Sequence, residues 1–150
     1  MTDRIEKEIL LRAPRARVWR AIADQSEFGA WFGVRFPAGT FASGQKVRGP
    51  ITYPGYEHLT MEIEVVEMVP ERRLAYRWHP YDVDPSVDRS SEPTTLVTFT
   101  LEEAEGGTRL TIVESGFDRI PLHRRDEAFR MNDSGWSEQL TNIERHVAAS

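Results

Sequence analysis

The 150-residue chain contains no cysteine, which excludes disulfides, thiolate zinc sites, iron–sulfur clusters and cysteine nucleophiles. It also lacks a P-loop, a GxGxxG fingerprint and a GxSxG nucleophile motif, the usual signatures of nucleotide-binding, dinucleotide-binding and hydrolase sites. These absences weaken every enzymatic hypothesis. We therefore expect no cofactor.

Long apolar runs and an excess of positive charge are missing as well. Residues 1–12 are charged throughout, which predicts neither a secretory signal nor a membrane span, so the cytoplasm is the expected compartment. The 24 acidic and 19 basic residues give a net charge of -5, which is unsuited to binding phosphate backbones, so we expect no nucleic-acid partner. Four arginines between residues 119 and 130 are interleaved with acidic residues and predict a solvated helical face.

The residues that are present predict a single α+β domain over residues 1–150. Period-two alternation favours strands near 4–12, 45–51, 58–68, 73–78, 94–101 and 108–114, with a bulge at Val65–Val66. Helical spacing of apolar residues predicts a short helix over 14–24 and a long one over 121–148. The aromatic and glycine-rich segment 27–36 is interpreted as a turn that leads into a strand.

The order of these elements predicts how they pack. An antiparallel sheet with one solvent-exposed face must have its other face covered by another element. The C-terminal helix is the element long enough to span that face. We therefore expect a curved antiparallel sheet wrapped around that helix, a helix-grip arrangement. The proline-rich segment 79–93 is a long loop, and loops of this length are often functional, so we expect a lid here.

Several segments also resemble a known family. They are Ala-Pro at 13–14 with VWRAI at 18–22, WFG at 31–33, ESGF at 114–117 and GW at 135–136. In this order they resemble the START-like (SRPBCC) superfamily, which includes the birch-pollen-allergen-like helix-grip proteins. Within it, they resemble the bacterial relatives of the activator of the ninety-kilodalton heat-shock protein ATPase. The resemblance covers residues 5–147 and implies a cavity between sheet and helix, which relatives use for lipids, polyketides, hormones or, in some cases, catalysis.

The resemblance bears on a chaperone partner too. The eukaryotic activators carry a separate N-terminal domain that engages the chaperone, whereas this chain begins almost directly with the first strand. That difference counts against chaperone activation, although a chaperone-associated module stays an alternative.

The inner face predicts where a ligand would bind. A structural core favours interlocking aliphatic residues, whereas Met, Tyr and Trp suit a pocket that also meets the polar groups of a ligand. A plain core is the alternative interpretation. The candidate ligand-binding residues are Trp31, Phe32, Met61, Ile63, Tyr76, Trp78, Val97, Phe99, Asn132, Trp136 and Leu140.

Asn132 and Asp133 fall where the apolar stripe of the long helix requires an apolar residue, so one of them is expected to direct a hydrogen-bonding group inward. A frayed or kinked helix is the alternative. The adjacent Gly135 fits either, because glycine within a helix costs about 1 kcal/mol and usually marks a close approach or a bend.

The four histidines lack the spacing of metal ligands, and Asp82, Asp84 and Asp88 lack the central glycine and closing glutamate of a calcium loop, so no metal is expected. His79 ends a strand before the long loop, which makes it the candidate for acid–base chemistry. The alternative is that His79 is a solvent-exposed histidine at a strand end with no chemical role.

These observations favour a binding protein for a hydrophobic small molecule over an enzyme. The alternatives are a cyclase- or hydrolase-type enzyme that uses the same cavity, and the chaperone-associated module.

Overall fold

The computed structural model describes residues 4–84 and 86–148. Its elements, in chain order, are β1 (Arg4–Leu11), α1 (Arg15–Ala23), α2 (Gln25–Phe32), β2 (Lys46–Pro50), β3 (Thr60–Val69), β4 (Arg73–Trp78), β5 (Thr95–Ala104), β6 (Gly107–Ser115), a 3-10 turn η1 (Phe117–Arg119) and α3 (Leu122–Ala148).

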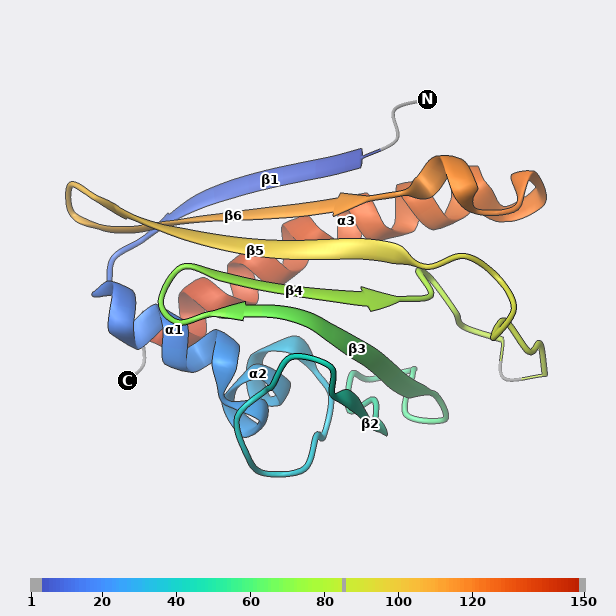
Figure 1. Cartoon of the computed structure of the whole chain (residues 1–150), viewed down its shortest axis with the longest axis horizontal. Helices are drawn as coiled ribbons and strands as arrows, with labels where there is room; N and C mark the ends of the chain where they lie inside the picture. Colours follow the sequence, from blue (N-terminus) through green and yellow to red (C-terminus); the bar gives the residue numbers. More distant parts are fainter. Residues whose placement is uncertain (1–3, 85, 149–150) are drawn as a thin grey trace.

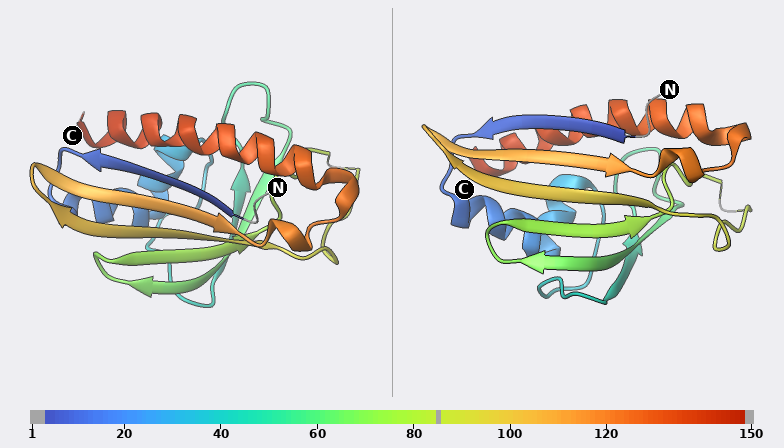
Figure 2. Two further views of the ribbon diagram at one scale, coloured as in Figure 1. Left: turned by 90° about the horizontal axis from the view of Figure 1, so that it is seen from above. Right: turned by 45° about the horizontal axis from the view of Figure 1, so that its top comes forward.

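The six strands form one antiparallel sheet in the order β1-β6-β5-β4-β3-β2. The first strand thus pairs with the last, and the remaining strands follow as hairpins, as Figure 1 shows. α3 runs along the concave side of this curved sheet, with α1 and α2 beside its C-terminal half (Figure 2). This is the predicted α+β helix-grip architecture.

The alternation predicted from sequence explains how the sheet faces the helix. Along β3 and β5, buried residues alternate with more exposed ones, so apolar side chains collect on one face. The predicted bulge is confirmed, because the pairing of β3 with β4 shifts register between Val65 and Glu67. None of the helices within residues 4–84 and 86–148 is long and apolar enough to cross a membrane.

One prediction was wrong, because residues 27–32 belong to the helix α2 rather than to a turn. Asp24 caps this helix by accepting from the backbone N–H of Glu27 at 2.9 Å, and Gly33 ends it in the left-handed conformation, with φ of 98°. The Asp-x-x-Glu spacing is a capping signal that the dense aromatic residues obscured.

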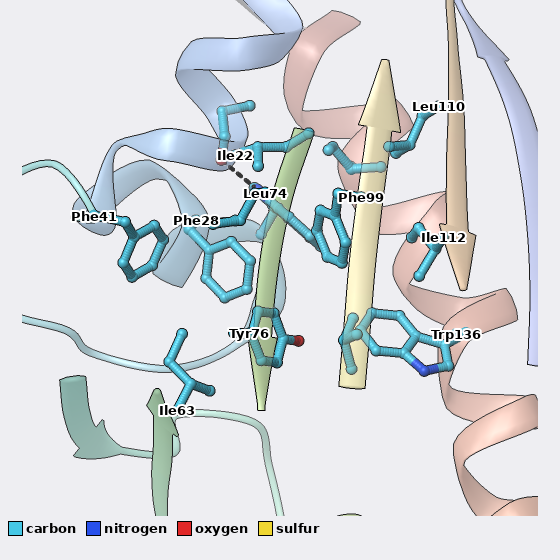
Figure 3. Close-up of a cluster of buried hydrophobic side chains, with 14 of the residues drawn as sticks. Ile22, Phe28, Phe41, Ile63, Leu74, Tyr76, Phe99, Leu110, Ile112 and Trp136 are labelled. Carbon is cyan, nitrogen blue, oxygen red and sulfur yellow. Dashed lines mark hydrogen bonds between the residues drawn. The ribbon is translucent and has the colours of Figure 1, made fainter. Parts of the chain in front are cut away.

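The interior beside α2 is filled with aromatic rings. Phe28 is fully buried and lies 4.9–6.2 Å, centroid to centroid, from the rings of Trp31, Phe32, Phe36, Phe41 and Phe99. Trp31 donates its indole N–H to the backbone oxygen of Ala21 at 2.8 Å, which holds α2 against α1. Figure 3 shows Phe99 between Phe28 and Trp136, with Tyr76 also next to Phe99.

Glu27 joins the three helices at this end. Its carboxylate accepts from Arg17 at 2.9 Å and Arg20 at 2.8 Å on α1, and from His146 on α3 at 3.0 Å. Burial acts to raise the pKa of Glu27, but the hydrogen bonds from these three partners outweigh it and lower the pKa. The C-terminal half of α3 is therefore fixed by both packing and charge.

Candidate functional site

A buried glutamate lies at the opposite end of the helix–sheet interface. Leu110, Ile112 and Glu114 follow one another on the inward side of β6, and all three are buried, Glu114 with 0% exposure. The period-two geometry that points the two aliphatic side chains at α3 therefore also points the carboxylate there. A charged residue at such a position requires several hydrogen-bond partners.

Four side chains donate to this carboxylate. One oxygen accepts from Trp136 Nε1 at 2.8 Å and Asn132 Nδ2 at 2.9 Å, both on α3. The other accepts from Trp78 Nε1 at 2.8 Å and Thr95 Oγ1 at 2.6 Å, with Asn132 Nδ2 at 3.1 Å. We call these five residues the Glu114 cluster. It ties β4, β5 and β6 to α3.

The chemistry of the cluster suits an ionised carboxylate, which is an acceptor only. The indole N–H groups of Trp78 and Trp136 and the amide NH2 of Asn132 donate to the carboxylate, and only the Thr95 hydroxyl could also accept, so three of the four partners suit an acceptor. Within residues 4–84 and 86–148, no cation forms an ion pair with Glu114. Its charge is therefore balanced by neutral dipoles, and the cluster is a fixed negative centre inside the molecule.

A cavity of about 640 Å³ lies next to this cluster. Its walls come from the segment around the β2–β3 loop and from the β4–β5 loop, and Phe32, Trp78 and Asn132 form part of its lining. Because Arg48, Glu62 and Val87 in its lining are exposed, the cavity opens to solvent. Its volume falls in the range of small-molecule sites.

A second cavity of about 80 Å³ adjoins the first one. Phe32, Trp78 and Asn132 line both, and Gly135, Trp136 and Gln139 complete the smaller one. A Cβ atom placed on Gly135 would meet nothing within 4 Å, so this glycine marks neither a close approach nor a crowded contact. It leaves open space at a helix position where alanine would be more stable.

The β4–β5 loop is attached to α3 through Arg124. This arginine, 7% exposed, contacts Glu92 at 3.0 Å and donates to the backbone oxygens of Pro80 at 3.0 Å and Tyr81 at 3.4 Å. Arg89 contacts Glu92 and Asp82 within the loop. Burial acts to raise the pKa of Glu92, but the two arginines lower it overall. The prediction that Arg124 lies on a solvated face is therefore wrong.

The other wall is attached to the same helix. Tyr53, in the β2–β3 loop, donates its hydroxyl to the carboxylate of Glu138 on α3. Both loops that border the main cavity are thus connected to α3 by polar contacts. The two attachments differ in burial, because the Tyr53–Glu138 contact is exposed whereas the contacts of Arg124 are largely buried. The exposed contact can break and re-form at lower cost than the buried ones.

Tyr76 lies beside the cluster without joining it. Its ring contacts Trp78 and Phe99, with centroids 5.5 Å and 6.1 Å away. The hydroxyl is buried and has no hydrogen-bond partner among the described residues. Burial, together with the charge of Glu114, raises the pKa of Tyr76 well above its usual value. Tyr76 therefore stays an uncharged phenol.

His79 lines the main cavity at the end of β4. Its Nε2 lies 3.1 Å from the backbone oxygen of Glu92, so Nε2 carries a hydrogen and donates. In the neutral tautomer Nδ1 is the basic nitrogen. No group of three or more His, Asp or Glu that could hold a metal ion is found in the described part of the chain.

The predicted ligand-binding residues divide into two groups. Phe32, Met61, Trp78 and Asn132 line the main cavity, and Trp136 lines the smaller one. The others lie in the packed core or against it: Trp31, Ile63, Tyr76, Val97, Phe99 and Leu140. Of the polar pair on α3, Asn132 is the residue directed inward, while Asp133 contacts Lys7 of β1 at 3.1 Å.

Sequence reasoning missed Glu114 as a site residue, although its motif carried part of the family resemblance. The signal was present, because Glu114 shares the parity of Leu110 and Ile112 and so had to face inward. Arg124 offered no comparable signal, since its partner Glu92 is distant in the sequence.

Comparisons with known proteins place this geometry in a family. The family model described as Activator of Hsp90 ATPase homolog 1-like protein matches residues 12–148. No curated protein matches the chain.

Solved structures resemble the whole chain. Protein MLL2253 from Mesorhizobium loti aligns with a TM-score of 0.76 and 22% identity over 98% of both chains. The Aha1 dimer from Colwellia psychrerythraea gives 0.72 and 14%, covering 98% of this chain and 96% of that one. DynU16, from the dynemicin biosynthetic locus, gives 0.74 and 23%, covering 99% of this chain but 48% of the other, so this chain spans about half its length. At these identities the likeness concerns the fold.

Proposed function

Because the chain belongs to the Activator of Hsp90 ATPase homolog 1-like family and its fold contains a cavity that opens to solvent, we propose that it binds an apolar or aromatic small molecule. The observation that carries the proposal is the contrast inside one interface. Aromatic rings fill the space between α2 and the sheet, whereas the end beside the Glu114 cluster keeps a cavity of about 640 Å³.

The lining supports an aromatic ligand. Phe32, Trp78 and Trp136 lie with ring centroids 5.9–6.1 Å apart. Phe32 and Trp78 line both cavities, and Trp136 lines the smaller one. Leu59, Met61 and Ile51 add aliphatic surface to the main cavity. Such a mixture of aromatic rings, a flexible Met and a few polar groups is typical of small-molecule sites.

Filling the smaller cavity tests the proposal. Gly135→Leu adds a side chain where open space lies, so the affinity for an uncharged aromatic probe such as 2-naphthol should fall at least tenfold in calorimetry. Ser134→Leu, on the exposed side of the same helix, is the matched control and should bind like the unmodified protein. Equal affinity of both variants would contradict this location of the site.

His79 favours a second candidate, an enzyme that uses the same cavity. The contact with the Glu92 backbone oxygen orients its ring, and the ring lines the cavity. His79→Ala should then abolish turnover of a substrate while leaving the binding of uncharged probes and the melting temperature nearly unchanged. Unchanged turnover would eliminate the acid–base role.

The family also suggests a chaperone-associated module. Addition of the chain to the ninety-kilodalton heat-shock protein, with ATP hydrolysis measured, tests this role. An increased hydrolysis rate would support the module, and an unchanged rate would dismiss it.

A further inference from the structure

Trp78, Asn132 and Trp136 of the Glu114 cluster line the smaller cavity, and we call these three side chains the floor. The floor offers a ligand hydrogen-bond acceptors rather than donors. Asn132 directs its Nδ2 at both oxygens of Glu114, at 2.9 and 3.1 Å. Rotation of the amide by 180° would place Oδ1 against two carboxylate oxygens, so the carboxylate fixes the orientation. Oδ1 therefore points away from Glu114, and it accepts no hydrogen bond from the described residues.

The nitrogen donors around the smaller cavity are already engaged. Trp78 and Trp136 donate their single indole hydrogens to Glu114, and Gln139 donates to the backbone oxygen of Phe32 at 2.8 Å. Apart from the second hydrogen of the Gln139 amide, the side chains that line this cavity present oxygens or apolar surface to a ligand.

The negative charge of Glu114 also influences which ligands can bind at the floor. Glu114 is a buried carboxylate, and none of its hydrogen-bond partners carries a positive charge that would offset it beside the cavities. The rim does not offset this charge, because Arg48 lies 3.9 Å from Glu62, and Arg89 contacts Asp82 and Glu92. An anionic ligand group would meet a negative centre at the floor.

We propose that the floor selects an uncharged aromatic ligand whose hydroxyl or amide N–H donates to Asn132 Oδ1, and that it rejects carboxylates such as fatty acids. This inference rests on the proposed small-molecule binding. Glu114 acts as a positioning residue: it orients the Asn132 amide and excludes negative charge, without itself touching the ligand.

Three probes with one ring system separate the contributions. At pH 7, 2-naphthol can donate, 2-methoxynaphthalene cannot donate, and 2-naphthoate carries a negative charge. We expect 2-naphthol to bind roughly fivefold more tightly than the methoxy compound, because one neutral hydrogen bond is lost. It should bind at least roughly tenfold more tightly than the naphthoate, because the charges repel. Calorimetry measures all three affinities.

In Glu114→Gln, the affinity ratio of 2-naphthol to 2-naphthoate should fall roughly tenfold, since the buried charge is gone. Glu27→Gln is the matched control, because it removes one negative charge near the C-terminal half of α3 and away from the cavities. Asn132→Ser, which shortens the acceptor, should abolish the preference for 2-naphthol over the methoxy compound, and it serves as the readout if Glu114→Gln does not fold by circular dichroism.

Each outcome decides between the two proposals. If the three probes bind in the predicted order of affinity and the variants lose this order, the result supports donor selection, that is, selection of ligands that donate a hydrogen bond to Asn132. Equal binding of the three probes, or tightest binding of the naphthoate, overturns donor selection while leaving small-molecule binding in place. Absence of binding by every probe overturns both.

Discussion

The two ends of the helix–sheet interface differ in how the space between sheet and helix is occupied. Beside α2, Phe28 and its neighbouring rings fill the space between sheet and helix. Beside the N-terminal half of α3, hydrogen bonds to Glu114 hold the elements together while two cavities stay open. Phe32 lies at the boundary, because it contacts Phe28 on one side and Trp78 on the other. Packing stabilises the first end, and directed polar contacts keep the second end open.

The largest expected effect concerns the filled end. Phe28→Ala should lower the free energy of unfolding by about 3–5 kcal/mol, because it leaves a cavity in a close-packed core. Phe32→Ala, at the boundary, should cost less, since part of its surface already faces open space. Urea denaturation measures both, and equal losses would remove the distinction between the ends.

At the open end, Glu114→Gln should lower the free energy of unfolding by about 2–3 kcal/mol. Whichever way the new amide turns, its NH2 group faces an indole N–H of Trp78 or Trp136, and neither can accept. Glu62→Gln, on the exposed rim, should cost almost nothing in the same measurement. A neutral Glu114→Gln variant would contradict a structural role for the carboxylate.

A smaller effect with a distinctive pH dependence is expected at the helix junction. Glu27→Gln should cost about 1 kcal/mol at pH 7, a modest figure because the ion pairs are partly solvated. The pKa of Glu27 is lowered in the folded state, so its contribution is present above the ordinary value of 4.5 and is lost as the pH falls through the folded value. Unfolding curves from pH 7 to pH 3 should converge for the variant and the unmodified protein.

The smallest effect has the opposite sign. Gly135→Ala should raise the free energy of unfolding by about 0.5–1 kcal/mol, because alanine is the better helix former and its Cβ meets no atom. Ser134→Ala, at an exposed position of the same helix, provides the comparison for propensity alone. Thermal unfolding checks both. Destabilisation by Gly135→Ala would mean that the space beside Gly135 is not open.

The sequence predicted the strands and the long helix better than it predicted either end of their interface. At the filled end, α2 was predicted as a turn. Strand alternation and the long helical stripe depend on local spacing, so the inward direction of residues such as Phe99 could be predicted from pattern alone. The Glu114 cluster depends on side chains from β4, β5, β6 and α3 that meet in three dimensions. One chain's pattern gives the inward parity of Glu114 but not its partners.

Asn132 and the loop contacts show the same difference between what local patterns predict and what depends on contacts between distant residues. The helical stripe indicated that Asn132 or Asp133 faces inward, but the choice depends on the position of Glu114. The β4–β5 loop was expected as a possible lid, yet its attachment through Arg124 and Glu92 joins residues 32 positions apart in the sequence. Volume, too, follows from backbone separations that no periodicity specifies.

The most direct test of the open end as a binding site is a titration with 2-naphthol, followed through the indole N–H signals in nitrogen-15 NMR spectra. We predict that the signals of Trp78 and Trp136, which line the cavities, shift on binding, while Trp31, held by Ala21 in the filled end, stays unchanged. A shift of Trp31 alone, or no shift of Trp78 and Trp136, would contradict the account.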